Sequence, residues 1–305
     1  MKRTLKDYGL ISLKGVAMGA ADVVPGVSGG TIAFISGIYT ELLQSIKSIN
    51  GQSLKLLLQG QFKTFWAAVN GNFLLALGIG IVFSLLTLAK LMTYLLENHA
   101  ILVWSFFFGL VVASAIYIAK EITQWNAAKL ISLLMGVSIA YLITHITPAQ
   151  PNTHYWFIFL SGAIAICAMI LPGISGSFIL LLLGMYKFII QSLSEMKIAV
   201  VATFALGAGV GLISFSNALS WLLNKYYELT IALLAGFMIG SLNKLWPWKE
   251  VVETYIDRHG EVKPLLEQNI MPMQHAAPNL LIALLMAAIG FSLIFIIEGV
   301  AKKSS

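Results

Sequence analysis

The sequence predicts an all-α polytopic membrane protein made of an inverted repeat, in which each half holds one re-entrant helical hairpin and three transmembrane helices. Of the 305 residues, 58% are hydrophobic and only 10% are charged, whereas a soluble domain carries about 25% charge. The apolar residues form blocks of about 20 residues, which is enough to cross a hydrocarbon core roughly 30 Å thick. A turn motif of proline, glycine and serine occurs twice. These three observations favour spanning helices over a soluble core.

The apolar blocks define the expected elements. They cover residues 10–24, 31–46, 73–96, 100–119, 129–147, 157–171, 177–193, 199–223, 229–245 and 279–298. Four blocks are too short to span a bilayer, and these are joined in pairs by Pro-Gly turns. Each pair is therefore expected to enter the membrane, break and leave on the same side, as re-entrant hairpins over 10–46 and 157–193.

The two hairpins belong to an internal repeat. Shared residues recur 147 positions apart: Pro25, Gly26, Ser28, Gly29, Gly37 and Tyr39 match Pro172, Gly173, Ser175, Gly176, Gly184 and Tyr186. The repeat divides a single transmembrane domain, 1–305, into halves at 10–147 and 157–298. With three full spans per half, the number of crossings is odd, so the second half is predicted to be inverted relative to the first.

Lysine distribution predicts the orientation. Most lysines fall on one side of the expected topology, which places both termini in the cytoplasm by the positive-inside rule. The segment 246–278 then forms an extracytoplasmic loop, and 47–71 is expected to lie on the cytoplasmic surface as one amphipathic helix. The net charge of +6 follows from this topology, so we expect no nucleic-acid partner.

The turns are the strongest candidates for a binding site. Irregular backbone at membrane depth is tolerated only where it is buried in protein or lines a wet cavity. A helix that starts there exposes its first amides, which bind anions and phosphate above all. The natural donors are Ser28, Thr31, Ser175 and Ser177, and the glycines Gly26, Gly29, Gly30, Gly173 and Gly176 let backbone approach a ligand. Alternatively, the turns only kink packed helices and the serines are N-caps.

Charged residues near the first turn have no counterpart in the second half. Lys14 and Asp22 lie on the entering helix, and their repeat equivalents are Ser161 and Met169. Asp22 is either a site for a coupling proton or cation, or a cap for the next half-helix. Glu41, like Tyr39, is expected at the cytoplasmic mouth, in a rim role or in contact with substrate. The histidines lack metal-ligand spacing, so no metal site is predicted.

At the paired motifs, Pro25-Gly26-Val27-Ser28-Gly29-Gly30-Thr31 and Pro172-Gly173-Ile174-Ser175-Gly176-Ser177, the chain resembles the PopT family of polyprenyl-phosphate transporters, long catalogued as a domain of unknown function. The resemblance implies a multi-pass protein of the bacterial cytoplasmic (inner) membrane. It further implies flipping of undecaprenyl phosphate from the outer to the inner leaflet for reuse in envelope polymers. The expected partners are that lipid and the membrane lipids, and a homo-oligomer is left open.

The resemblance leaves two other functions open. The turns are also similar to those of undecaprenyl pyrophosphate phosphatases, but Gly29 and Gly176 stand where those enzymes carry an arginine, so catalysis is disfavoured. A small-anion carrier or channel would use the same helix termini. For the lipid carrier we expect no organic cofactor. The partial charges at helix ends are too small to neutralise a phosphate headgroup inside the membrane. A coupling H⁺ or Na⁺ is therefore expected.

Overall fold

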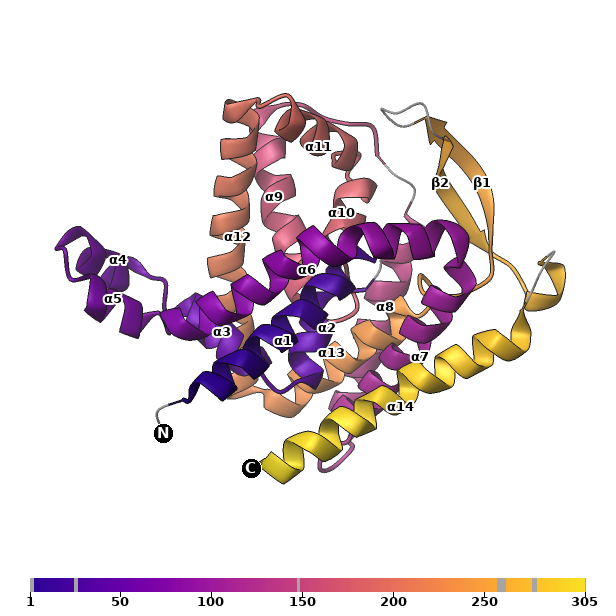
Figure 1. Ribbon diagram of the computed structural model, residues 1–305, viewed down its shortest axis with the longest axis horizontal. Coiled ribbons are helices and arrows are strands. Elements are labelled where there is room, and N and C mark those ends of the chain that lie inside the picture. Colours follow the sequence, from indigo (N-terminus) through magenta and orange to yellow (C-terminus); the bar gives the residue numbers. More distant parts are fainter. Residues whose placement is uncertain (1–2, 25–26, 147–148, 257–261, 276–278, 305) are drawn as a thin grey trace.

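The computed structural model describes residues 3–24, 27–146, 149–256, 262–275 and 279–304, and these form a helical assembly with one small sheet (Figure 1). The helices of the first half are α1 (Leu5–Val23), α2 (Gly29–Ile35), α3 (Tyr39–Lys47), α4 (Gly51–Leu58), α5 (Phe62–Ala68), α6 (Gly71–Asn98), α7 (Ala100–Ala119) and α8 (Ala127–His145). The second half contains α9 (Tyr155–Ile170), α10 (Gly176–Leu182), α11 (Tyr186–Ser194), α12 (Ile198–Lys225), α13 (Tyr227–Ser241), β1 (Lys249–Ile256), β2 (Val262–Asn269), the 3₁₀ turn η1 (Pro272–Gln274) and α14 (Leu280–Ser304).

Several helices have the length and composition of membrane spans. Among the described residues, α6, α7, α8 and α12 are long and apolar enough to cross a bilayer. Three shorter apolar helices accompany them, namely α9, α13 and the 280–296 part of α14. The helical membrane class predicted from sequence is therefore confirmed, while the number of six spans stays a prediction.

The return arm of each hairpin is broken, contrary to the single helices predicted over 31–46 and 177–193. In the first half α2 ends before Gly37 and α3 follows it, and in the second half α10 and α11 flank Gly184. The axes of α10 and α11 differ by 108°. Both glycines adopt a positive φ, 74° and 68°, which is the conformation that commonly ends a helix. Apolar side chains on both sides of each break conceal it in a hydropathy profile.

The long helices pack in four pairs. Helix α1 lies along α6 and α9 lies along α12, so each half pairs its entering helix with its first long span. The other two pairs are exchanged between the halves, because α7 packs on α14 and α8 packs on α13. Glycines permit the close approach: a Cβ at Gly15 would collide with the Leu77 carbonyl, and one at Gly162 with the Phe204 carbonyl.

Two surface segments differ from the sequence prediction. The expected amphipathic helix over 47–71 is two short helices, α4 and α5, separated at Gly60 with φ 73°. The segment 246–278 contains an antiparallel hairpin of β1 and β2, so the fold is not purely α. Residues 249–256 are rich in β-branched side chains, a signal for a strand that the search for apolar blocks did not register.

Candidate functional site

The residues that follow the first Pro-Gly motif meet the second Pro-Gly turn inside the protein. Ser28 Oγ, on the first turn, donates a hydrogen bond to the carbonyl oxygen of Met169 at 2.8 Å. In the opposite direction, the amide of Gly173 donates to Thr31 Oγ1 at 3.0 Å. Both hydroxyl-bearing side chains are completely buried. Polar groups of the first motif therefore bond to the backbone of the second, across 141 and 142 residues of sequence.

Glycine at residue 30 permits this close contact. A Cβ at Gly30 would lie 3.0 Å from the carbonyl carbon of Ile170 and closer still to its oxygen. The same carbonyl accepts a hydrogen bond from the Tyr39 hydroxyl at 3.2 Å. Tyr39 is only 3% exposed, so its side chain lies in the protein interior, and its place toward the cytoplasmic mouth stays a prediction. Its ring packs in the core, where the hydroxyl needs a partner and finds one in the opposing turn.

The start of α2 is capped by two side chains. Asp22 Oδ1 accepts a hydrogen bond from the Gly29 amide at 2.7 Å, and Ser28 Oγ accepts one from the Gly30 amide at 3.0 Å. These amides are among those that a helix start leaves without an intrahelical partner. Of the two roles considered for Asp22, the cap is the one this geometry displays.

Lys14 occupies the opposite end of the same short helix. Its ammonium donates to the carbonyl oxygen of Ser36, the C-cap of α2, at 2.7 Å. Helix α1 thus places a carboxylate at the positive end of α2 and an ammonium at the negative end, which is the favourable arrangement for the helix dipole. In the second half, the residues at these positions are Ser161 and Met169, so α10 has no such pair of charges.

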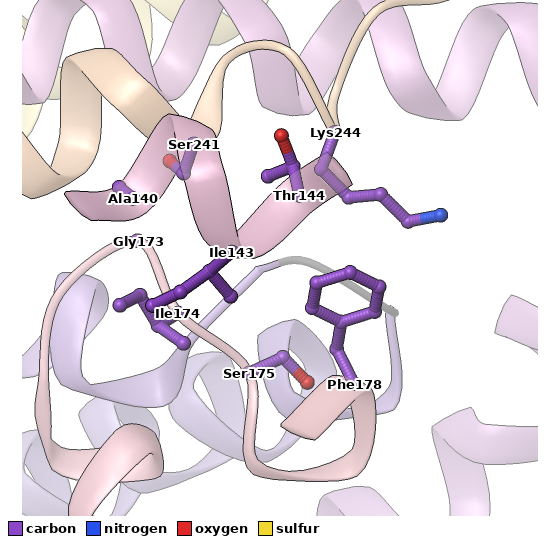
Figure 2. A pocket seen from close by; sticks show the side chains of 9 residues that line it. All are labelled: Ala140, Ile143, Thr144, Gly173, Ile174, Ser175, Phe178, Ser241 and Lys244. Atoms are coloured by element: carbon purple, nitrogen blue, oxygen red, sulfur yellow. The ribbon is translucent and has the colours of Figure 1, made fainter. Parts of the chain in front are cut away.

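The second turn lines a small recess (Figure 2). Ser175 Oγ and Ser177 Oγ share a hydrogen bond of 2.7 Å, and Ser175 makes no side-chain cap bond to α10. Gly173, Ile174 and Ser175 face the ends of α8 and α13 across the recess, as Figure 2 shows. Thr144, Ser241 and Lys244 are the polar residues on that side, although the Thr144 hydroxyl donates to the Tyr141 carbonyl oxygen at 2.7 Å and the Ser241 hydroxyl to that of Met238 at 2.8 Å.

Glu41 is bonded to the N-terminal segment and to Asn70. Both of its carboxylate oxygens accept hydrogen bonds from the Arg3 guanidinium, at 2.5 and 2.6 Å, and Oε1 also accepts one from Asn70 at 2.8 Å. A bidentate pair of this kind fixes the N-terminal segment against α3 and the start of α6. Glu41 is therefore engaged by the protein itself, in this conformation.

The remaining predicted residues fall into two groups. Pro25 and Gly26 lie outside the described residues. Pro172, Gly173 and Gly176 are buried in the second turn. Gly173 has φ 88°, and a Cβ at Gly176 would lie 2.6 Å from the Ala165 carbonyl oxygen, so both positions need glycine.

Sequence reasoning missed the far wall of the recess. Thr144, Ser241 and Lys244 sit at helix ends that a search for apolar blocks treats as interfacial. One signal was available, because Gly109 and Ser114 recur 127 positions later as Gly236 and Ser241, and both serine side chains are buried. Lys244 carried no comparable signal, since lysines are common at helix ends near an interface.

Comparisons with known proteins identify the family of this chain. A family model described as undecaprenyl phosphate translocase-like matches residues 18–263, which include both turns. The chain belongs to this family. It is 45% identical over 296 residues to a polyprenyl-phosphate transporter of Vibrio cholerae, covering 95% of this chain and 96% of that protein. It is also 32% identical over 253 residues to a polyprenyl-phosphate transporter of Staphylococcus aureus, covering 77% and 85%. No solved structure matches the chain.

Both of these relatives carry the name of a polyprenyl-phosphate transporter. The match extends through α1 from Met18 to the sheet, and it includes Asp22 and the recess residues. Lys14 and α14 lie outside the matched range.

Proposed function

We propose that this protein carries undecaprenyl phosphate from the outer to the inner leaflet of the bacterial cytoplasmic membrane, where the lipid is reused in envelope polymer synthesis. Family membership and the names of the two relatives support a polyprenyl phosphate as the substrate. The apolar helices support a membrane location.

One observation carries the assignment of the site: two irregular turns meet in the buried interior and differ in how their polar groups are used. On the first turn, Ser28 and Thr31 are bonded to the opposing backbone. On the second, Ser175 and Ser177 bond to each other, so both hydroxyls retain acceptor or donor capacity. The first turn holds the two halves together, and the phosphate group binds to the second turn.

The proposed topology has six spans and two re-entrant hairpins, with the second half inverted and both termini cytoplasmic. Equal helix boundaries support the repeat, since α10 and α11 begin and end 147 residues after α2 and α3. Helix α7 of the first half packs on α14 of the second, and α8 packs on α13. This reciprocal packing supports a twofold relation between the halves.

Transport also needs a partner for the headgroup charge. We propose that H⁺ or Na⁺ accompanies the lipid, because a phosphate cannot cross an apolar core without neutralisation. Asp22 is the carboxylate beside the turns and exchanges this ion as the carrier changes conformation. Its bond to the Gly29 amide places it beside Ser28 and Gly30, which contact the second half, so a change of its charge can act on that contact.

A phosphatase is the second candidate for such turns, and the names of the relatives favour transport over it. Gly29 and Gly176 supply no side chain that could stabilise a transferring phosphoryl group. A small-anion carrier differs from the lipid carrier in its substrate, so the experiment below includes that substrate.

The test is a leaflet-resolved assay in proteoliposomes that contain undecaprenyl phosphate. The wild type is expected to move the lipid between leaflets without hydrolysing it to inorganic phosphate. It is also expected not to transport inorganic phosphate that has been loaded into the lumen. Ser28→Leu and Ser175→Leu are expected to abolish transport, while Ser194→Leu, at an exposed serine, preserves it. Hydrolysis, or flux of free phosphate alone, refutes the lipid carrier. Normal transport in both turn variants reduces the motif to a helix kink.

A further inference from the structure

Two lysines and a glutamate meet beside the recess, where α13 leads into the sheet. The ammonium groups of Lys244 and Lys249 each lie 3.6 Å from Glu267 Oε2, which is on β2. Lys249 also donates a hydrogen bond to the Lys244 carbonyl oxygen at 2.9 Å, and its ammonium lies 3.8 Å from the centre of the Trp104 ring. The three side chains and the ring form what we call the lysine cluster, defined as Trp104, Lys244, Lys249 and Glu267.

The lysine cluster sets two lysines against a single carboxylate. In the described part of the chain, both ion pairs of these lysines go to the one carboxylate of Glu267. The Lys249 side chain is only 7% exposed. Burial, and then the nearby Lys244 ammonium, lower the pKa of Lys249 to about 7. Holding a second charge here is therefore unfavourable, and another anion close to the lysines would relieve that cost.

Lys244 connects the lysine cluster to the second turn. It lines the recess together with Thr144, Ser175 and Ser241, and its ammonium lies 5.1 Å from the centre of the Phe178 ring (Figure 2). The free volume of the recess is about 10 Å³, which holds roughly one water molecule. A phosphate group is larger than this, so the recess is closed in this conformation and must widen to admit one.

We propose that Lys244 and Lys249, with the hydroxyl pair of Ser175 and Ser177, form a binding site for a phosphate monoester, and that Glu267 is an internal competitor that occupies the lysines until the ligand arrives. A phosphate monoester carries about 1.5 to 2 negative charges at neutral pH, more than a carboxylate does. It therefore neutralises both lysines and releases Glu267. The identity of the ligand as a prenyl phosphate rests on the proposed function; the anion site itself does not.

The test uses the full-length protein in detergent and isothermal titration calorimetry with two probes, inorganic phosphate and a short-chain prenyl monophosphate. Lys244→Gln is expected to weaken binding of both probes by about tenfold or more, because it removes a charge-assisted contact. Glu267→Gln is expected to tighten binding by about fivefold to tenfold, because it removes a like charge from the site. Lys225→Gln removes a lysine that stacks on Trp221 elsewhere, and Glu195→Gln removes the partner of Lys197; both are expected to leave affinity unchanged.

Two features keep the test decisive. Lys244→Arg retains the charge and is expected to restore most of the affinity, and the gain in Glu267→Gln cannot come from misfolding. Unchanged affinity in both Lys244→Gln and Glu267→Gln overturns the site, and so does a wild type that binds neither probe. If the probes bind with the expected changes while the wild type does not move undecaprenyl phosphate between leaflets, the anion site stands and the transport function fails.

Discussion

Replacing Gly30 by alanine tests whether the two turns must touch for transport. The added Cβ would lie well under 3.0 Å from the Ile170 carbonyl oxygen, whereas ordinary contact begins at 3.4 Å, so the two backbones must separate by roughly 1 Å. Overpacking of this kind costs about 1–3 kcal/mol. Alanine in a helix recovers about 1 kcal/mol relative to glycine. The net destabilisation is then about 0–2 kcal/mol, which leaves the protein folded with displaced turns.

The expected result is folded protein with a transport rate reduced by about tenfold to a hundredfold, the loss that a 1 Å displacement causes in catalytic sites. The proteoliposome assay measures the rate, and thermal unfolding in detergent measures the stability. Gly78→Ala is the matched control, because a Cβ at this α6 position meets nothing within 4 Å. It is expected to keep full transport and the same or slightly higher stability. Wild-type transport by Gly30→Ala would refute the interlocked turns.

Three further predictions follow from the same geometry. Asp22→Asn keeps an acceptor for the cap but removes the charge, so it is expected to flatten the dependence of transport on pH or sodium; wild-type dependence would leave Asp22 as a cap only. Cysteines introduced one at a time for Gln150 and Lys55, in a Cys167→Ala background, are expected to react with an impermeant thiol reagent from outside and inside respectively, and the reverse pattern refutes the topology. Thr31→Val leaves the buried Gly173 amide without its partner, and is expected to lower the free energy of unfolding by about 1–3 kcal/mol in denaturant titrations; no change would show that another acceptor replaces it.

The fold class and the turns could be predicted because their signals are local. Long apolar blocks report spans directly, and a duplicated Pro-Gly-x-Ser-Gly needs no three-dimensional information to be noticed. The breaks at Gly37 and Gly184 were less visible, although both glycines are part of the repeat. A glycine inside an apolar block is compatible with a continuous helix, and only its positive φ distinguishes a break.

The arrangement of charges could not be predicted, because each partner is set by the tertiary fold. Lys14 binds a backbone carbonyl, that of Ser36, which carries no sequence signature at all. Thr31 and Ser28 were expected to face a ligand, yet their partners are peptide groups of the other half. Lys244 gained its significance only when the β-hairpin, missed in the sequence, brought Glu267 beside it.

The exchanged helix pairs constrain how the protein is made. Helix α7 emerges from the ribosome long before its packing partner α14, the last helix of the chain, and α8 must wait for α13. Gly109 and Gly136 let the backbones of the partner helices pack closely against α7 and α8. The helix faces around these glycines stay uncovered until the partner helices are made. The first half is therefore not an independent folding unit, and insertion must precede assembly. Separate expression of residues 1–150 and 151–305 is expected to yield stable protein only when both fragments are present in the same membrane, since each fragment supplies the helix that completes the other.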